Sequence, residues 1–145
     1  MNDPITRNIN SSVQKTYEWL VDMERELHTG DRQIAYHALR SVLHALRDRL
    51  PVGEAVDLAA ELPMLLRGLY YEGWRPTHKP EKLNREEFLR RIADNYGAPS
   101  APDPLRFTRA VLSVLEMRIA SGEMSDVRLT LPKDIQELWP SLRGS

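Results

Sequence analysis

The chain has 145 residues, of which 41% are hydrophobic and 28% charged, with a formal net charge of −1 and no cysteine. This length suffices to bury a core, and the lack of cysteine excludes disulfides, thiolate metal sites and cysteine nucleophiles. The balanced charge differs from the basic excess of proteins that bind nucleic acid non-specifically, and no apolar run approaches the roughly 20 residues of a membrane-spanning helix. We therefore expect a soluble cytoplasmic protein with no membrane partner.

Apolar residues of the first half recur at helical spacing. Ser11 and Ser12 are a typical pair of helix caps, and the stripe that follows them consists of Val13, Tyr17, Leu20, Val21 and Leu27. Gly30 and the prolines that follow predict where one helix ends and the next begins. The helices expected in this half cover residues 13–29, 32–50, 51–62 and 63–70.

The second half restarts the same pattern. Asn84 is a good helix cap with acidic residues in the following turn. Residues 97–104 contain three prolines and are expected to form a loop. Helices are expected over residues 84–96 and 105–119, in a short segment after Gly122, and from Pro132 onward. Apolar and polar residues alternate over residues 127–131, as they do in a strand. The matching segment of the first half has a helical pattern, so we expect a helix here as well.

The two halves are related in sequence. Residues 52–70 (VGEAVDLAAELPMLLRGLY) and 121–139 (SGEMSDVRLTLPKDIQELW) align without gaps and are identical at six of nineteen positions, where composition alone gives about one. We therefore predict an all-α, internally duplicated helical bundle of two four-helix repeats. The first covers residues 11–73 and the second 84–142, joined by an ordered linker over 74–83. A unit of roughly 60 residues is marginally stable alone, so the repeats should pack together.

A longer motif resembles a known family. The run GExxDLxxxLPxLxRGLYYEGWRP, followed by a short basic linker and an asparagine-capped EEFLRRIA helix, is similar to the bacterial family catalogued as domain of unknown function 2267. The resemblance extends from about Tyr17 to Trp139 and implies an all-helical, duplicated fold. It implies no activity, cofactor or catalytic residue.

Four acidic residues occupy equivalent positions in the two copies. Glu54 and Asp57 are three apart, as are Glu123 and Asp126, so each pair shares one helix face. Paired carboxylates can exchange protons or hold a cation. First-turn acids also stabilise a helix through its macrodipole, and their repetition in both copies favours this structural role.

Metal and nucleophile signatures are weak. The four histidines, none of them in a close-spaced pair, are His28, His37, His44 and His78. His37 and His44 lie about 10 Å apart along one helix, too far for a single ion to bridge. With Arg40 and Arg47 they form a polar stripe that we expect to face solvent or a partner. We predict no metal, no cofactor and no catalytic residue.

The stretch 70–80, YYEGWRPTHKP, combines aromatic and basic residues at the junction between the copies. Gly73 is a natural helix cap, and Trp74 is expected to cover the seam between the repeats. Tryptophan, tyrosine and arginine dominate the energetic centres of protein interfaces. The first interpretation of this stretch is a structural junction that caps the first repeat. The second is a partner-binding surface, with Tyr71, Trp74, Arg75 and His78 as the candidate binding residues.

The leading functional prediction is a non-enzymatic intracellular helical module that binds a protein partner or itself. One alternative is a small-molecule or metal-dependent enzyme that uses the repeated acids between the copies. It requires those four side chains to converge on a polar pocket. The other alternative is a nucleic-acid-associated protein, which requires a continuous arginine face near Trp74. Acidic residues alternate with the arginines of the second half, which argues against nucleic acid.

Overall fold

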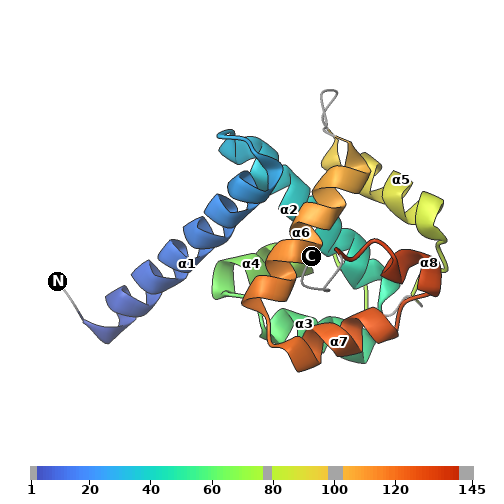
Figure 1. Ribbon diagram of the computed structural model, residues 1–145. Coiled ribbons are helices and arrows are strands. Elements are labelled where there is room, and N and C mark those ends of the chain that lie inside the picture. The colour runs from blue at the N-terminus through green and yellow to red at the C-terminus, as the bar shows by residue number, and fades with distance from the viewer. Residues whose placement is uncertain (1–2, 77–79, 98–102, 141–145) are drawn as a thin grey trace.

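The computed structural model describes residues 3–76, 80–97 and 103–140, which form eight helices and no strand (Figure 1). The helices are α1 (Pro4–Leu27), α2 (Arg32–Arg49), α3 (Val52–Ala60), α4 (Met64–Tyr71), α5 (Arg85–Tyr96), α6 (Pro104–Arg118), α7 (Ser121–Leu129) and α8 (Lys133–Gln136). The prediction of an all-α protein is confirmed. None of these described helices is long and apolar enough to cross a lipid bilayer.

Helix α1 begins seven residues before the predicted cap at Ser11. The Asp3 carboxylate accepts a hydrogen bond from the Thr6 backbone N–H at 2.8 Å, and Pro4 occupies the first helical position. An aspartate cap followed by proline is a strong start signal, because proline fixes a helical φ and lacks an N–H that would be unsatisfied there. Ser11 and Ser12 therefore lie inside the helix.

The other predicted boundaries are close to those observed. Asn84 and Glu87 form a reciprocal capping box at the start of α5, with both hydrogen bonds at 2.9 Å. Pro63 and Pro132 immediately precede α4 and α8. Residues 127–129, where alternation resembled a strand, belong to α7. Helix α8 is a single turn, shorter than the sequence predicted.

Helix α2 lies at the centre of the molecule. It contacts α1, α3, α4, α5 and α6, and most of its side chains from Ala35 to Leu46 are buried. Around it, α1 packs on α6 and α3 packs on α7, with α3 and α7 side by side in Figure 1. Every described helix contributes to one connected apolar core. Helices from the two halves of the chain thus share their hydrophobic surface.

One part of the predicted apolar stripe of α1 is not buried. Val13, Tyr17 and Val21 are 38%, 48% and 37% exposed, whereas Trp19 and Met23 carry the packing of α1 onto the core. Leu20 and Leu27 of the predicted stripe are buried, so the face that meets the core includes these two residues but turns away from the other three.

A tight turn ends α4. Glu72 has φ −57° and ψ 121°, Gly73 has φ +79°, and the Trp74 N–H donates to the Tyr71 carbonyl at 2.9 Å. These values define a type II turn over residues 71–74, which requires a positive φ at its third residue. Glycine adopts that conformation without steric cost. The turn brings the side chains of its first and last residues together.

Two glycine substitutions should therefore have opposite effects. Gly73→Ala should lower the free energy of unfolding by about 1 kcal/mol, because an L-residue is strained at positive φ. Gly68→Ala, in the middle of α4, should raise it by about 0.5–1 kcal/mol. A Cβ atom at either glycine meets no atom within 4 Å, so backbone conformation alone distinguishes them. Urea unfolding of the two variants measures the difference, and equal shifts would contradict the turn assignment.

Candidate functional site

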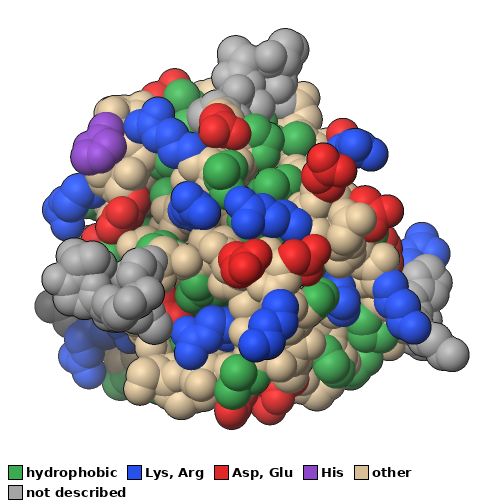
Figure 2. Space-filling view, turned by 45° about the vertical axis from the view of Figure 1, so that its right-hand side comes forward, with side chains coloured by type: hydrophobic (Ala, Val, Ile, Leu, Met, Phe, Trp, Pro, Cys, Tyr) green, Lys and Arg blue, Asp and Glu red, His purple; other side chains and the backbone are tan. Residues whose placement is uncertain are grey.

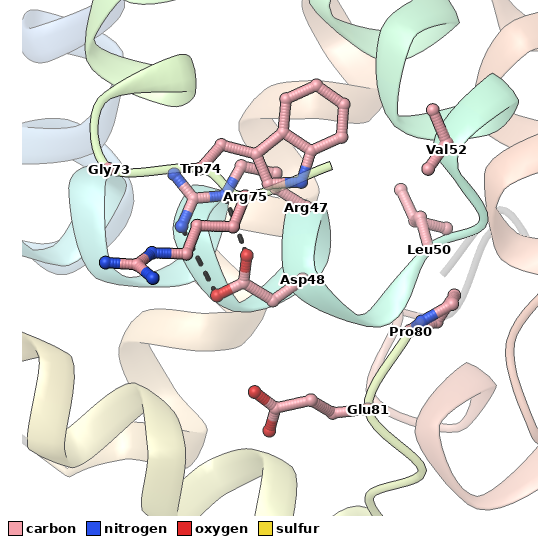
Figure 3. Close-up of a pocket in the computed structure, with 9 residues that line it drawn as sticks. All are labelled: Arg47, Asp48, Leu50, Val52, Gly73, Trp74, Arg75, Pro80 and Glu81. Carbon is pink, nitrogen blue, oxygen red and sulfur yellow. Dashed lines mark hydrogen bonds and ion pairs between the residues drawn. The ribbon is translucent and has the colours of Figure 1, made fainter. Parts of the chain in front are cut away.

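A cleft of about 250 Å³ lies where α2 ends, beside the turn after α4. Its lining residues come from three separate segments and are Arg47, Asp48, Leu50, Val52, Gly73, Trp74, Arg75, Pro80 and Glu81 (Figure 3). We call it the Trp74 cleft. The Glu81 backbone N–H donates to the Asp48 carbonyl at 3.2 Å, which holds the linker against the end of α2.

Trp74 forms an aromatic wall of this cleft. Its ring stacks on Tyr71, with centroids 5.4 Å apart and an interplanar angle of 23°, and Tyr71 meets the buried Tyr70 edge to face. The Tyr70 hydroxyl donates to the Ala55 carbonyl at 2.8 Å, and burial raises its pKa. Trp74 is half-buried, so one part of its ring packs on the protein and another part faces the cleft.

Arg47 is the buried charge beside the cleft, with 5% of its surface exposed. Its guanidinium donates to both carboxylate oxygens of Asp48, at 2.8 and 3.3 Å. The remaining nitrogen donates at 2.8 Å to the carbonyls of Tyr70 and Glu72. These carbonyls end α4, where no intrahelical donor is available, so Arg47 caps the helix from outside.

His44 supports the same helix end. Its Nε2 lies 2.7 Å from the Leu69 carbonyl, and because a carbonyl can only accept, Nε2 carries the proton. Burial is the main cause that lowers the pKa of His44, and the nearby Arg47 and Arg40 act in the same direction. A neutral imidazole at pH 7 therefore serves as a fixed donor.

These contacts correct the prediction that the histidine and arginine stripe of α2 faces solvent. His44 and Arg47 are buried against α4, and Arg40 lies 3.6 Å from the Glu72 carboxylate. His37 is half-buried and contacts the rings of Tyr36 and Tyr96. His44 and Arg47 are polar because they meet backbone carbonyls at the end of α4.

Three of the four predicted binding residues lie together. Tyr71 stacks on Trp74, which lines the cleft with the exposed Arg75. His78 lies outside the described residues. Sequence reasoning missed Asp48 and Glu81, because neither belongs to the aromatic motif that drew attention to this region.

The charged groups of the cleft are largely committed to ion pairs. Arg47 is paired with Asp48, and Glu81 is paired with Arg91 of α5. The carboxylate oxygens of Asp48 and Glu81 accept hydrogen bonds from these guanidinium groups. The arrangement suits recognition by packing and hydrogen bonding rather than proton transfer.

The four repeated acids converge where α3 packs on α7. Burial raises the pKa of Glu54, with Asp126 and Asp57 adding to the effect. Burial also raises the pKa of Glu123, followed by repulsion from Glu54, Asp57 and Asp126. One shielded carboxylate oxygen on each glutamate has no hydrogen-bond partner among the described residues. Within residues 3–76, 80–97 and 103–140, no group of three or more histidines or acids is placed to hold a metal ion.

Removing one of these charges should stabilise the protein at neutral pH. A carboxyl with a raised pKa binds its proton more tightly in the folded chain, so its ionised form opposes folding at pH 7. That penalty fades as the pH falls below the ordinary value of 4.5. We expect Glu123→Gln to raise the melting temperature at pH 7, with the gain disappearing near pH 4.

Glu86→Gln is the matched control for this substitution. Glu86 lies in the first turn of α5 and is exposed, so its replacement removes a helix-dipole contact without relieving the α3–α7 cluster. It should leave the melting temperature at pH 7 unchanged or slightly lower. Equal behaviour of the two variants from pH 4 to 8 would show that the acids do not repel one another.

Arg47 should be among the most sensitive polar positions. Arg47→Met leaves Asp48 and two carbonyls without their donor, and we expect a loss of about 3 kcal/mol in the free energy of unfolding. Arg47→Lys should recover little, because an ammonium group cannot reproduce the planar fork. Arg40→Met, which removes a longer surface ion pair, should cost less than about 1 kcal/mol. Denaturant unfolding distinguishes these outcomes, and equal losses for Arg47→Met and Arg40→Met would refute the capping role.

Comparison with curated proteins finds no significant match. A family model described as uncharacterized conserved protein (DUF2267) matches residues 16–138. The match spans most of the chain and includes both the Trp74 cleft and the α3–α7 acids. It confirms the resemblance carried by the LP and YYEGW motifs. The chain therefore belongs to the DUF2267 family.

Proposed function

We propose that the protein is a non-enzymatic cytoplasmic binding module whose Trp74 cleft receives a side chain of a protein partner. The observation that carries the proposal is the half-buried Trp74, stacked on Tyr71 beside a cleft and held by a type II turn. An aromatic group that is fixed before binding loses little conformational entropy when a partner arrives. Such rigid aromatic anchors are typical of interface hot spots.

The size and charge of the cleft favour one kind of ligand. Its volume of about 250 Å³ is below the range of roughly 300–1,000 Å³ typical of small-molecule sites, and it suits a single inserted side chain. Arg47 and Glu81 are paired, whereas Arg75 is exposed at the edge of the cleft. We infer a partner segment with an apolar side chain beside an acidic one.

We also propose that the scaffold is a duplication of a four-helix unit. Helices α3 and α7 each have nine residues, carry an acid in the first turn, and pack on each other. Helices α4 and α8 each follow a proline of nearly identical backbone conformation. Helix α1 packs on α6 as α5 packs on α2, which is the reciprocal contact expected of two related units.

A second candidate function, acid–base catalysis, is favoured by the convergence of the repeated acids. Burial raises the pKa of Glu54 and of Glu123, and a carboxyl with a raised pKa can act as a general acid beside a second carboxyl group. The shielded glutamate oxygens limit access to that pair, so this candidate ranks second. On the face shown in Figure 2, acidic and basic side chains are intermixed, which favours a protein partner over a nucleic-acid backbone.

Selection of displayed random peptides on the folded protein tests the proposed cleft. Selected peptides should combine an acidic and a large apolar residue. Trp74→Ala should weaken the binding of these peptides at least ten-fold. Arg75→Ala should remove the preference for an acidic residue in the selected peptides. Tyr36→Ala is the control, because Tyr36 is an exposed aromatic residue at the other end of α2. Selected peptides that bind Trp74→Ala as tightly as the wild type would reject the proposal.

Fluorescence locates the binding event. Trp19 and Trp139 are buried, so acrylamide quenching reports mainly on Trp74. A bound peptide should reduce that quenching. Because Trp74 is only half-buried, Trp74→Ala should cost about 1–2 kcal/mol of stability and leave the protein folded, which keeps the binding test valid.

A further inference from the structure

The amino-terminal part of α1 extends beyond the rest of the molecule. Helix α1 has 24 residues, twice the length of α5, and its first turns point away from the other helices in Figure 1. The chain nevertheless specifies this helix start with the Asp3 cap and Pro4. Most helical stability in proteins comes from tertiary packing of an apolar face, which this end of α1 lacks. A projecting end with its own start signal therefore calls for a contact outside the molecule.

The exposed apolar residues of α1 follow a single line. They occur at every fourth position and are Ile5, Ile9, Val13, Tyr17 and Val21, with exposed fractions of 72%, 57%, 38%, 48% and 37%. We call this line the α1 ridge. Residues four apart form one of the ridges by which helices pack, and two such ridges interdigitate at a crossing angle of about −50°. Large side chains exposed in one continuous row indicate an interaction surface.

We propose that the α1 ridge docks on the α1 ridge of a second copy of this chain, antiparallel about a two-fold axis at Val13. In this register Val13 meets its own counterpart and Ile9 lies opposite Tyr17. Ile5 and Val21 point about 80° to either side of Val13, because a helix turns about 100° per residue, so they flank the contact. The Val13 pair and the two Ile9–Tyr17 pairs give the self-complementarity that a two-fold interface requires.

The charge distribution along α1 favours the antiparallel direction. From residue 3 to 15 the charged side chains are Asp3, Arg7 and Lys15, a net of +1. From residue 16 to 27 they are Glu18, Asp22, Glu24, Arg25 and Glu26, a net of −3. Antiparallel packing sets the positive half of one helix against the negative half of the other, where Glu18 and Glu24 also pair with Arg118 and Arg32 of their own chain. It also aligns the helix macrodipoles in opposite directions.

The surface beside the ridge offers space for the second copy. A hollow of about 290 Å³ is lined by Gln14, Tyr17, Glu18, Val21, Asp22, Arg25 and Arg118. In the proposed register Ile9 of the second copy approaches this hollow, and the two-fold axis repeats the contact on the other side.

Cysteine cross-linking tests the register directly, because the chain contains no cysteine. Val13→Cys should form a disulfide-linked dimer on mild oxidation, since the two-fold axis places this residue next to its own copy. Val56→Cys is the control, as Val56 is also a valine and is 43% exposed on α3. We expect at least ten times more dimer for Val13→Cys than for Val56→Cys. Equal yields would overturn the proposed axis.

Sedimentation equilibrium of the full chain tests the association itself. The wild-type protein should be a dimer, and Ile9→Asp should weaken dimerisation at least ten-fold while the monomer keeps its helical circular dichroism spectrum. Met117 is an apolar residue of α6 that is 58% exposed, and the Met117→Asp variant should remain dimeric. A wild-type monomer at 100 micromolar, or an Ile9→Asp variant with unchanged mass, would overturn the proposal. Trp74→Ala should remain dimeric, so this test is independent of the cleft.

Discussion

The interaction on which the Trp74 cleft depends is the capping of α4 by Arg47. Helix α4 has eight residues, and the carbonyls of its last turn point into the protein, where an unpaired acceptor is costly. Arg47 reaches them from α2 while Asp48 fixes the other edge of its guanidinium. The end of α4 is thereby positioned against the end of α2. The turn at Gly73 and the stacked Trp74 follow from that position.

The same solution recurs at other helix ends. Arg67 donates to the carbonyls of Ala59 and Leu62 after α3, and Arg106 donates to the Leu27 carbonyl at the end of α1. A bundle of short helices has many ends for its size, and each leaves carbonyls without an intrahelical donor. Arginine suits them because its planar fork carries several donors. The partly buried cations of this protein therefore serve its architecture, which weakens their value as evidence for catalysis.

Sequence patterns predict the helices well but do not reveal contacts between distant segments. Periodicity and proline positions give the order of elements, and Asn84 marks α5 correctly. The burial of Arg47 could not be predicted, because its carbonyl partners lie 23 and 25 residues further along the chain. The exposure of Tyr17 has a similar origin, since a period of 3.6 residues defines an apolar stripe but not the edge of the core that covers it.

The Trp74 cleft and the α1 ridge have no residue in common, so the two proposed contacts do not compete for the same surface. This arrangement has a physical consequence. A cleft of about 250 Å³ that accepts one side chain offers limited affinity by itself. A dimer joined through α1 presents two clefts on one particle, and a partner with two matching segments then binds the second intramolecularly. Effective concentration, rather than additional contacts within each cleft, raises the strength of such binding.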